Sequence, residues 1–155
     1  DVYKRQIGTG GTLSGISQYL KSKNPEISIG LADPHGASMY NYFKNGELKA
    51  EGSSITEGIG QGRITKNVEG SIIDFPYLID DAEALEIVFT LIKKEGLFLG
   101  LSSGINIAGA KRLAKDLGKG STIVTILCDL ADRYKGKMFN IKFLKENNLP
   151  IPEWL

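Results

Sequence analysis

A loop rich in glycine and threonine, placed directly before a helical pattern, constrains this chain most. The loop reads Gly8-Thr9-Gly10-Gly11-Thr12, and the apolar residues that follow it recur at helical spacing. Glycines let the backbone adopt positive φ and approach a ligand closely. Backbone N–H groups at a helix N-terminus, together with the helix dipole, favour an anion. The loop is therefore predicted to bind a phosphate.

Two other kinds of phosphate loop fit less well. A P-loop needs Lys directly after its last Gly, and Leu13 and Ser14 stand where Gly-Lys should be. The dinucleotide pattern needs Gly at position 13. Because the loop contains no Lys or Arg, neutral donors and the helix dipole would hold the anion, which suits the phosphate monoester of a tightly held cofactor. The alternative is a glycine-rich connection that binds nothing.

The composition excludes several classes of protein. A chain of 155 residues suits one domain with a real core. Its net charge of +1 gives no electrostatic footprint for nucleic acid or anionic lipid, and no apolar run is long enough for a membrane span. We therefore expect neither nucleic acid nor membrane as a partner. The single Cys excludes an internal disulfide, which favours a reducing, cytoplasmic location.

The single His and the single Cys cannot form a zinc site of the usual kind, so no metal is expected. His35 follows Asp33-Pro34 and is predicted to be a solvated loop residue rather than a catalytic base. Cys128 ends an apolar run with no His after it, and is predicted to be a buried packing residue rather than a nucleophile.

Helical and extended patterns alternate along the chain. Helices are predicted over 12–23, 37–44, 80–94 and 105–117, and strands over 27–32 and 122–127. The run 122–127 is continuously apolar, as in a strand buried on both faces. The Gly-rich segment 51–65 is predicted to be a functional or disordered loop, and the tail 139–155 to hold one short helix. This alternation predicts an α/β fold: an open, mostly parallel sheet with helices on both faces.

Three loops are expected at the carboxyl ends of strands, where open parallel sheets bind ligands. They are the loop 8–12, the stretch 101–104 and the segment beginning Cys128-Asp129. Taken alone, Ser102 and Ser103 could be ordinary helix N-caps, and the glycines of 57–62 an ordinary flexible loop. Their occurrence together with a phosphate loop in one small sheet favours a ligand site.

Four motifs, in this order, resemble those of one family. They are Gly8-Thr9-Gly10-Gly11-Thr12, Ser54-Ile55-Thr56-Glu57-Gly58-Ile59-Gly60, Gly100-Leu101-Ser102-Ser103-Gly104, and Ile126-Leu127-Cys128-Asp129 with Arg133-Tyr134. Together they closely resemble the cysteine synthases (O-acetylserine sulfhydrylases) of the fold-type-II, pyridoxal-phosphate-dependent β-family, which has cystathionine β-synthase as a near relative. The resemblance runs from about residue 7 to 155 and covers only the C-terminal half of such an enzyme.

The resemblance implies a tryptophan synthase β-like fold, pyridoxal 5'-phosphate as cofactor and a β-replacement reaction. In that reaction O-acetylserine and sulfide give cysteine and acetate, and the cofactor is the electron sink. Ser102 would donate a hydrogen bond to the pyridine nitrogen, or share one with it, and as a neutral group would leave the ring unprotonated. The cofactor phosphate would be held by Gly8, Thr9, Gly10, Gly11 and Thr12, and the substrate would lie near Gly58, Ile59 and Gly60.

The chain departs from the family pattern in two places. The lysine that forms the Schiff base lies in the N-terminal half of such enzymes, and no Lys of this chain stands in that motif. The chain is therefore expected to hold no catalytic residue and to be inactive alone. Lys4-Arg5-Gln6 is also wrong for a buried strand. Residues 1–6 are accordingly expected to be junction or non-native sequence, and 7–155 to be the C-terminal, cofactor-phosphate-binding part of the enzyme.

The expected partners are a small amino-acid substrate, the missing N-terminal half and, for the full-length parent, a second copy in a homodimer. Two alternatives stay open. One is another type-II lyase, such as cystathionine β-synthase or a serine/threonine dehydratase, with 33–62 holding the discriminating contacts. The other is a non-catalytic module that binds a phosphate ligand, an interpretation that the missing lysine supports.

Overall fold

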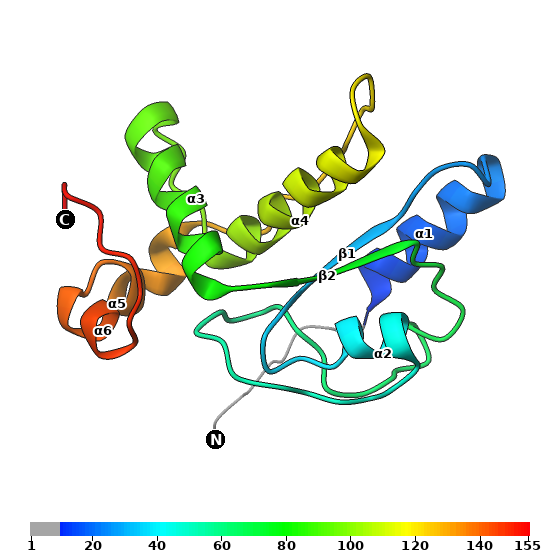
Figure 1. Cartoon of the computed structure of the whole chain (residues 1–155), viewed down its shortest axis with the longest axis horizontal. Helices are drawn as coiled ribbons and strands as arrows, with labels where there is room; N and C mark the ends of the chain where they lie inside the picture. The colour runs from blue at the N-terminus through cyan, green and yellow to red at the C-terminus, as the bar shows by residue number, and fades with distance from the viewer. Residues whose placement is uncertain (1–9) are drawn as a thin grey trace.

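The computed structural model describes residues 10–155 (Figure 1). Gly8 and Thr9 of the predicted phosphate loop, and the segment 1–6, lie outside the described residues. The elements are α1 (Gly11–Lys23), β1 (Gly30–Pro34), α2 (Met39–Asn45), β2 (Phe75–Ile79), α3 (Asp81–Glu95), α4 (Leu101–Leu117), the 3-10 turn η1 (Ala131–Tyr134), α5 (Lys135–Met138) and α6 (Ile141–Glu146).

The sheet of the described chain pairs β1 with β2 in parallel, from Gly30 opposite Phe75 to Pro34 opposite Ile79. Side chains of a strand alternate between its two faces. Leu31 packs on one face with residues of α1 and α2, and Ala32 packs on the other against α4. Figure 1 shows α3 and α4 on one side of the strands and α2 on the other. The predicted α/β fold, with a parallel sheet and helices on both faces, is confirmed.

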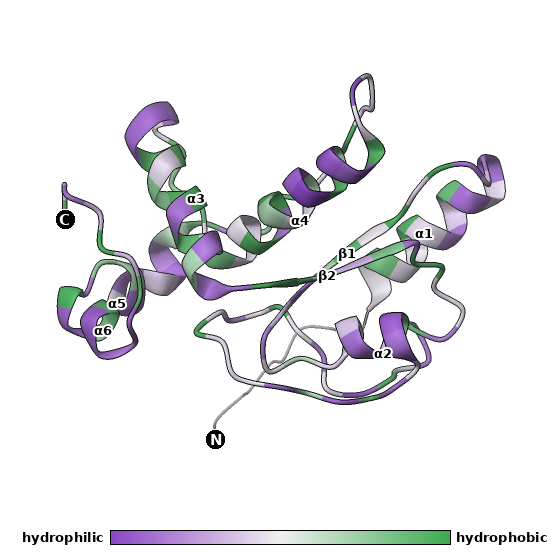
Figure 2. Cartoon of the chain, in the orientation of Figure 1, coloured by the Kyte–Doolittle hydropathy of each residue, from purple (hydrophilic) through white to green (hydrophobic). Residues whose placement is uncertain are grey.

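Helix α3 forms where the charge pattern predicts a helix. Asp81 and Glu83 lie in its first turn, and Lys93 and Lys94 in its last, so both ends match the helix dipole. Gly96, at a φ of 67°, ends the helix with its N–H bonded to Ile92 O. Figure 2 shows the hydrophilic colour of that last turn, which points away from the rest of the chain.

Helices α3 and α4 approach closely at Gly104. A Cβ on Gly104 would lie 2.6 Å from Ala84 O, so a larger residue would push the helices apart. Beyond this crossing, a cluster of buried apolar residues joins α3 and α4 to η1, α5 and α6. Its buried members are Leu85, Val88, Phe89, Leu99, Leu101, Ala131, Tyr134, Met138 and Leu144.

Two expectations about strands differ from the structure. The strand β2 was not predicted, because Pro76 and the acidic residue before it interrupt the apolar pattern. The predicted strand 122–127 forms no strand within residues 10–155, and Val124 is 89% exposed. An apolar run predicts burial, but a strand forms only where a neighbouring strand accepts its hydrogen bonds. Leu99 and Leu130 form an isolated antiparallel bridge nearby.

Helix α1 buries its small polar side chains instead of its largest apolar ones. Ser14 and Ser17 are buried, whereas Ile16 is 40% and Tyr19 63% exposed. An amphipathic helix packs its apolar stripe inward, so this face of α1 is left without a covering element in the described chain. No helix within residues 10–155 combines the length and apolar character needed to cross a membrane.

Candidate functional site

Ser102 lies in the first turn of α4, and its side chain is almost fully buried. Its hydroxyl donates a hydrogen bond to Asp129, with Oγ 2.7 Å from Oδ1. An ionised carboxylate only accepts hydrogen bonds, so the Ser102 proton points toward Asp129 in this arrangement. Toward any second partner, Ser102 presents the lone pairs of its oxygen as long as its proton stays there.

Ser103 and Gly100 bind the backbone of the residues at and before Asp129. Its hydroxyl accepts a hydrogen bond from Cys128 N at 2.9 Å, and Gly100 N donates to Asp129 O at 2.9 Å. The N-cap of α4 is Gly100, and it receives no side-chain cap bond. Ser102 and Ser103 are therefore not N-caps. Their hydrogen bonds join residues 128–129 to the start of α4.

Gly100 is required at this junction by the space around it. A Cβ there would lie 2.2 Å from Asp129 Oδ1 and 2.9 Å from Tyr134 Cε2. The missing side chain lets both groups pack directly against the backbone that begins α4. Asp129 also faces Arg133, with Oδ2 3.7 Å from the guanidinium.

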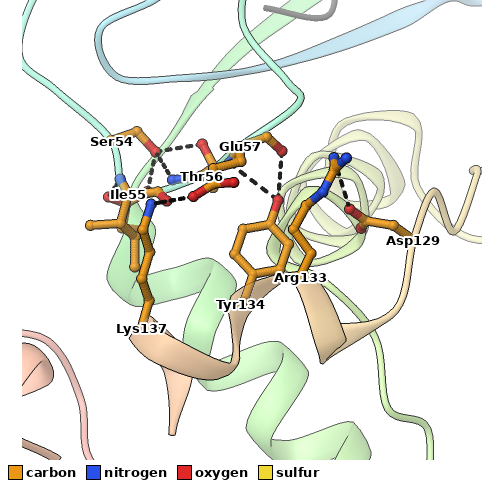
Figure 3. A network of polar contacts seen from close by, with 9 residues as sticks. Ser54, Ile55, Thr56, Glu57, Asp129, Arg133, Tyr134 and Lys137 are labelled. Carbon is orange, nitrogen blue, oxygen red and sulfur yellow. Dashed lines mark hydrogen bonds and ion pairs between the residues drawn. The ribbon is translucent and has the colours of Figure 1, made fainter. Parts of the chain in front are cut away.

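The loop 54–57 is held from one side by the first residue of α3. Asp81 accepts hydrogen bonds from the Ser54 hydroxyl and, at 2.8 Å, from Ile55 N. Ser54 Oγ in turn accepts from Thr56 N at 3.0 Å. Figure 3 shows Ser54 and Thr56 at the left of the network.

The same loop is held from its other side by η1 and α5 (Figure 3). Tyr134 Oη accepts from Glu57 N at 3.2 Å and donates to Glu57 O at 2.5 Å. Lys137 Nζ donates to Ile55 O at 2.9 Å and lies 2.8 Å from the Glu57 carboxylate. Desolvation by burial raises the pKa of Tyr134 to about 12, so its hydroxyl keeps its proton at neutral pH.

The predicted substrate-proximal residues follow this loop directly. Gly58 has a φ of 83° and Gly60 a φ of 95°, backbone conformations that favour glycine. Ile59 packs against a buried cluster that includes Ile105 of α4. The structure therefore brings these residues beside the helix that carries Ser102. That they contact a substrate stays a prediction.

Gly10 is the first described residue of the predicted phosphate loop and the N-cap of α1. Its φ is 70°, and a Cβ there would lie 2.2 Å from Val68 Cγ2, so the chain approaches Val68 as only glycine allows. Gly11 and Thr12 follow in the first turn of α1, which contains no acidic residue. That these residues and Ser102 converge on one ligand also stays a prediction.

His35 and Cys128 both lie at the surface, and only for Cys128 does this differ from the prediction. His35 lies in the loop after β1 with its ring 2.8 Å from Asp80 Oδ1, and the side chain is partly exposed. The prediction that Cys128 is buried is wrong. Cys128 is exposed, because no strand of the described chain covers the run before it, and its Sγ accepts a hydrogen bond from Asn106. Within residues 10–155 no cluster of His, Cys, Asp and Glu could hold a metal ion.

Sequence reasoning missed the residues that hold the loop, and it missed Asp33 as a titrating group. Asp33 is buried at the end of β1 and accepts a hydrogen bond from Tyr40 N at 2.9 Å. Desolvation raises the pKa of its carboxyl to about 6, against the lowering effect of the backbone N–H groups. A charged residue that closes an apolar strand was the available signal.

The family model for the pyridoxal-phosphate dependent enzymes matches residues 3–129. The chain belongs to this family. Pyridoxal phosphate is the cofactor of the family, as its description states. The four motifs described above lie within or directly after the matched residues.

Relatives of this family member are cysteine synthases. Cysteine synthase 1 of Neurospora crassa is 44% identical and covers 100% of this chain, which spans only 43% of that protein. The cysteine synthase of Buchnera aphidicola is 35% identical, over 96% of this chain and 47% of its own length. A crystal structure described as an O-acetylserine dependent cystathionine beta-synthase from Helicobacter pylori is 37% identical with a TM-score of 0.72, over 85% of this chain and 41% of that one.

The donors of the described chain fit the two ends of pyridoxal 5'-phosphate. The phosphate is a dianion, and the N-terminus of α1 offers a positive dipole end with no carboxylate in its first turn. An unprotonated pyridine nitrogen needs one donor, and the buried Ser102 hydroxyl at the start of α4 can supply it by turning its proton from Asp129 to the ring. The chemistry of the donor set is therefore compatible with the family cofactor.

Proposed function

We propose that this chain is the cofactor-phosphate-binding part of a cysteine synthase. The whole enzyme would convert O-acetylserine and sulfide to cysteine and acetate by β-replacement. The observation that carries the proposal is the 44% identity to cysteine synthase 1 of Neurospora crassa over all of this chain. Because the chain spans 43% of that relative, the activity belongs to the whole protein.

The phosphate of the cofactor would be held by Gly8, Thr9, Gly10, Gly11 and Thr12. Backbone N–H groups at the start of α1 and the positive end of its dipole supply the attraction, and the Thr12 hydroxyl adds a donor. The close approach of Gly10 to Val68 supports this role, because it fixes the turn from which these groups point.

Ser102 would face the ring nitrogen. When bound, pyridoxal phosphate supplies the electron sink for breaking bonds at the α- and β-carbons of an amino acid. The part of this chain is to present one hydroxyl oxygen at a fixed place. Asp129 fixes it, because the 2.7 Å hydrogen bond that it accepts from Ser102 selects the rotamer of that side chain. A neutral ring nitrogen only accepts hydrogen bonds, so Ser102 would bond it as a donor, with its proton turned from Asp129 toward the ring.

Gly58, Ile59 and Gly60 would lie along the amino-acid substrate. Their packing beside α4 supports this placement, since Ile59 contacts the cluster around Ile105. Gly60 packs closely on the end of β1, where a Cβ would lie 3.0 Å from Ala37 Cβ and 3.2 Å from Pro34 Cγ, so this turn has a fixed place for its N–H and C=O groups.

The rest of the enzyme, with the Schiff-base lysine, would cover the apolar surface that this chain exposes. Val124 is 89%, Leu130 58% and Ile126 45% exposed, and contiguous apolar surface of this kind marks an interaction site. We place the whole enzyme in the cytoplasm as a homodimer. One relative is a putative mitochondrial cysteine synthase of Saccharomyces cerevisiae, so a mitochondrial location is the alternative.

A second candidate is an O-acetylserine-dependent cystathionine β-synthase. The observation that favours it is the structural match to the Helicobacter pylori enzyme of that description, with a TM-score of 0.72. The two reactions share the first substrate and differ in the nucleophile, which is sulfide in one and homocysteine in the other.

The test uses the full-length protein that carries this chain, loaded with pyridoxal phosphate. O-acetylserine is supplied with sulfide or with homocysteine, and cysteine and cystathionine are quantified separately. Cysteine formed faster from sulfide supports the proposal. Cystathionine as the main product favours the second candidate, and no product with either nucleophile would refute both.

A further inference from the structure

The loop 54–57 belongs to a long connection between α2 and β2 that contains no helix or strand. Loops of this kind are ordinarily the most mobile parts of a domain. Here side chains from three separate elements bind its backbone: Asp81 of α3, Tyr134 of η1 and Lys137 of α5. Figure 3 shows Tyr134 and Lys137 beside the loop. We call these three residues the clamp.

Tyr134 is the most specific member of the clamp. A single hydroxyl bonds both backbone groups of Glu57, accepting from N at 3.2 Å and donating to O at 2.5 Å. The side chain is fully buried, so its ring is also fixed by packing. With the pKa of Tyr134 raised to about 12, the hydroxyl serves as both donor and acceptor throughout the neutral range.

Lys137 adds a charge to the same turn. Its ammonium bridges Ile55 O, at 2.9 Å, and the Glu57 carboxylate, at 2.8 Å. Two contacts from one ammonium fix the spacing between the backbone of Ile55 and the side chain of Glu57. The lysine side chain is 31% exposed, so this bond is open to water and weaker than that of Tyr134.

The clamp ends where the predicted substrate segment begins. Gly58 directly follows Glu57 and has a φ of 83°, a backbone conformation that favours glycine. Tyr134 also packs against Gly100, where a Cβ would lie 2.9 Å from its ring. The same tyrosine therefore touches the backbone that begins α4 and the backbone that leads into Gly58–Gly60.

We propose that Tyr134 and Lys137 are positioning residues, which hold Ser54–Glu57 against η1 and α5 so that Gly58–Gly60 meets the amino-acid substrate in a fixed place. The clamp itself stands on the contacts described above. Only its consequence for substrate binding rests on the proposed function.

The first test is Tyr134→Phe in the full-length, pyridoxal-phosphate-loaded protein. Phenylalanine keeps the ring and removes both bonds to Glu57. We expect the Glu57 amide to exchange with deuterium about fivefold to tenfold faster, and KM for O-acetylserine to rise by a similar factor with kcat within about twofold. Tyr77→Phe is the matched control, because it removes a hydroxyl bond to Asp116 on an exposed surface.

The second test uses Lys137, whose loss does not disturb a buried ring. Lys137→Met should raise KM about twofold to threefold, and Lys137→Arg should restore most of the loss, because a guanidinium can still bridge the carbonyl and the carboxylate. Lys142→Met is the control, since that side chain is 84% exposed and lies 3.8 Å from Glu146.

The outcomes separate the two proposals. Unchanged exchange at Glu57 in Tyr134→Phe overturns the clamp, whatever the activity. Faster exchange with unchanged KM, or a fall in kcat alone, overturns the positioning role. If the unmodified protein makes neither cysteine nor cystathionine, the proposed function fails, while the exchange measurement still decides whether the clamp exists.

Discussion

Ser102 and Asp129 form a hydrogen-bonded pair, 2.7 Å from Oγ to Oδ1, that joins the first turn of α4 to the segment that follows the apolar run 122–127. They lie 27 residues apart in the sequence. The pair is locked from three sides, because Ser103 binds Cys128 N, Gly100 N binds Asp129 O, and Gly100 leaves room for the carboxylate. Its first consequence is a defined direction for the Ser102 proton.

Asp129→Ala would leave the buried Ser102 hydroxyl without its acceptor. We expect a loss of about 1–3 kcal/mol in the free energy of unfolding, measured by urea denaturation of the full-length protein. Asp129→Asn keeps an acceptor oxygen at nearly the same place and should lose less than half as much. Equal losses for the two variants would mean that the Ser102 hydrogen bond contributes little.

Ser102→Asp would place a second carboxyl group against Asp129. Two carboxyl groups at hydrogen-bond distance repel each other when both are ionised. The pKa of one of them should therefore be higher in the folded protein than in the unfolded chain. The variant should therefore be least stable, relative to the unmodified protein, at neutral pH, and should recover as the pH falls toward about 4. Thermal melts from pH 4 to 8 measure this, with Ser102→Asn as the uncharged control.

The sequence was sufficient to locate helices whose ends carry their own signals. For α3, acidic residues in the first turn and Lys93, Lys94 and Gly96 at the end predicted both limits to within a residue. It was insufficient for strands, because 122–127 has the apolar composition of a central strand, yet its pairing depends on a neighbour that the described chain does not contain.

The candidate site was predictable only where one segment carries the signal. Ser102 and the glycines of 58–60 stand in recognisable local patterns. The residues that hold them do not, because Lys137 donates to the carbonyl of Ile55, 82 positions earlier, and Asp81 accepts from the N–H of the same residue, 26 positions earlier. Such contacts follow from how α3, η1 and α5 pack, which no local pattern in the sequence describes.

Asp33 should make stability depend on pH in the mildly acidic range. Burial raises the pKa of its carboxyl in the folded state from 3.8 to about 6, so between these values the folded protein binds a proton that the unfolded chain has lost. The stability associated with this group is fully present below pH 3.8 and is lost as the pH rises through about 6.

The measurement for Asp33 compares Asp33→Asn with the unmodified protein. Asparagine keeps an acceptor for Tyr40 N and does not ionise. We expect the unmodified protein to lose stability as the pH rises from 4 to 7, because Asp33 becomes a buried charge, whereas the variant should not. The difference in the free energy of unfolding should therefore grow with pH in favour of the variant. Asp132→Asn is the control, because that carboxyl is 59% exposed and pairs with Lys135 on the surface. A difference independent of pH would contradict the assignment.

Gly100→Ala should be among the most damaging single-methyl additions in this chain. The new Cβ would lie 2.2 Å from Asp129 Oδ1 and 2.9 Å from Tyr134 Cε2, so both side chains must move. Overpacking of this kind destabilises by about 1–3 kcal/mol. Because it displaces Asp129 and Tyr134 together, it should also speed exchange at the Glu57 amide. Gly15→Ala in α1 is the matched control, since no atom of residues 10–155 lies within 4 Å of its added Cβ, and a helical Ala in place of Gly stabilises by about 0.5–1 kcal/mol. In urea denaturation, Gly100→Ala should lower the free energy of unfolding and Gly15→Ala should raise it. If Gly100→Ala leaves the free energy of unfolding unchanged, Asp129 and Tyr134 do not pack on this backbone.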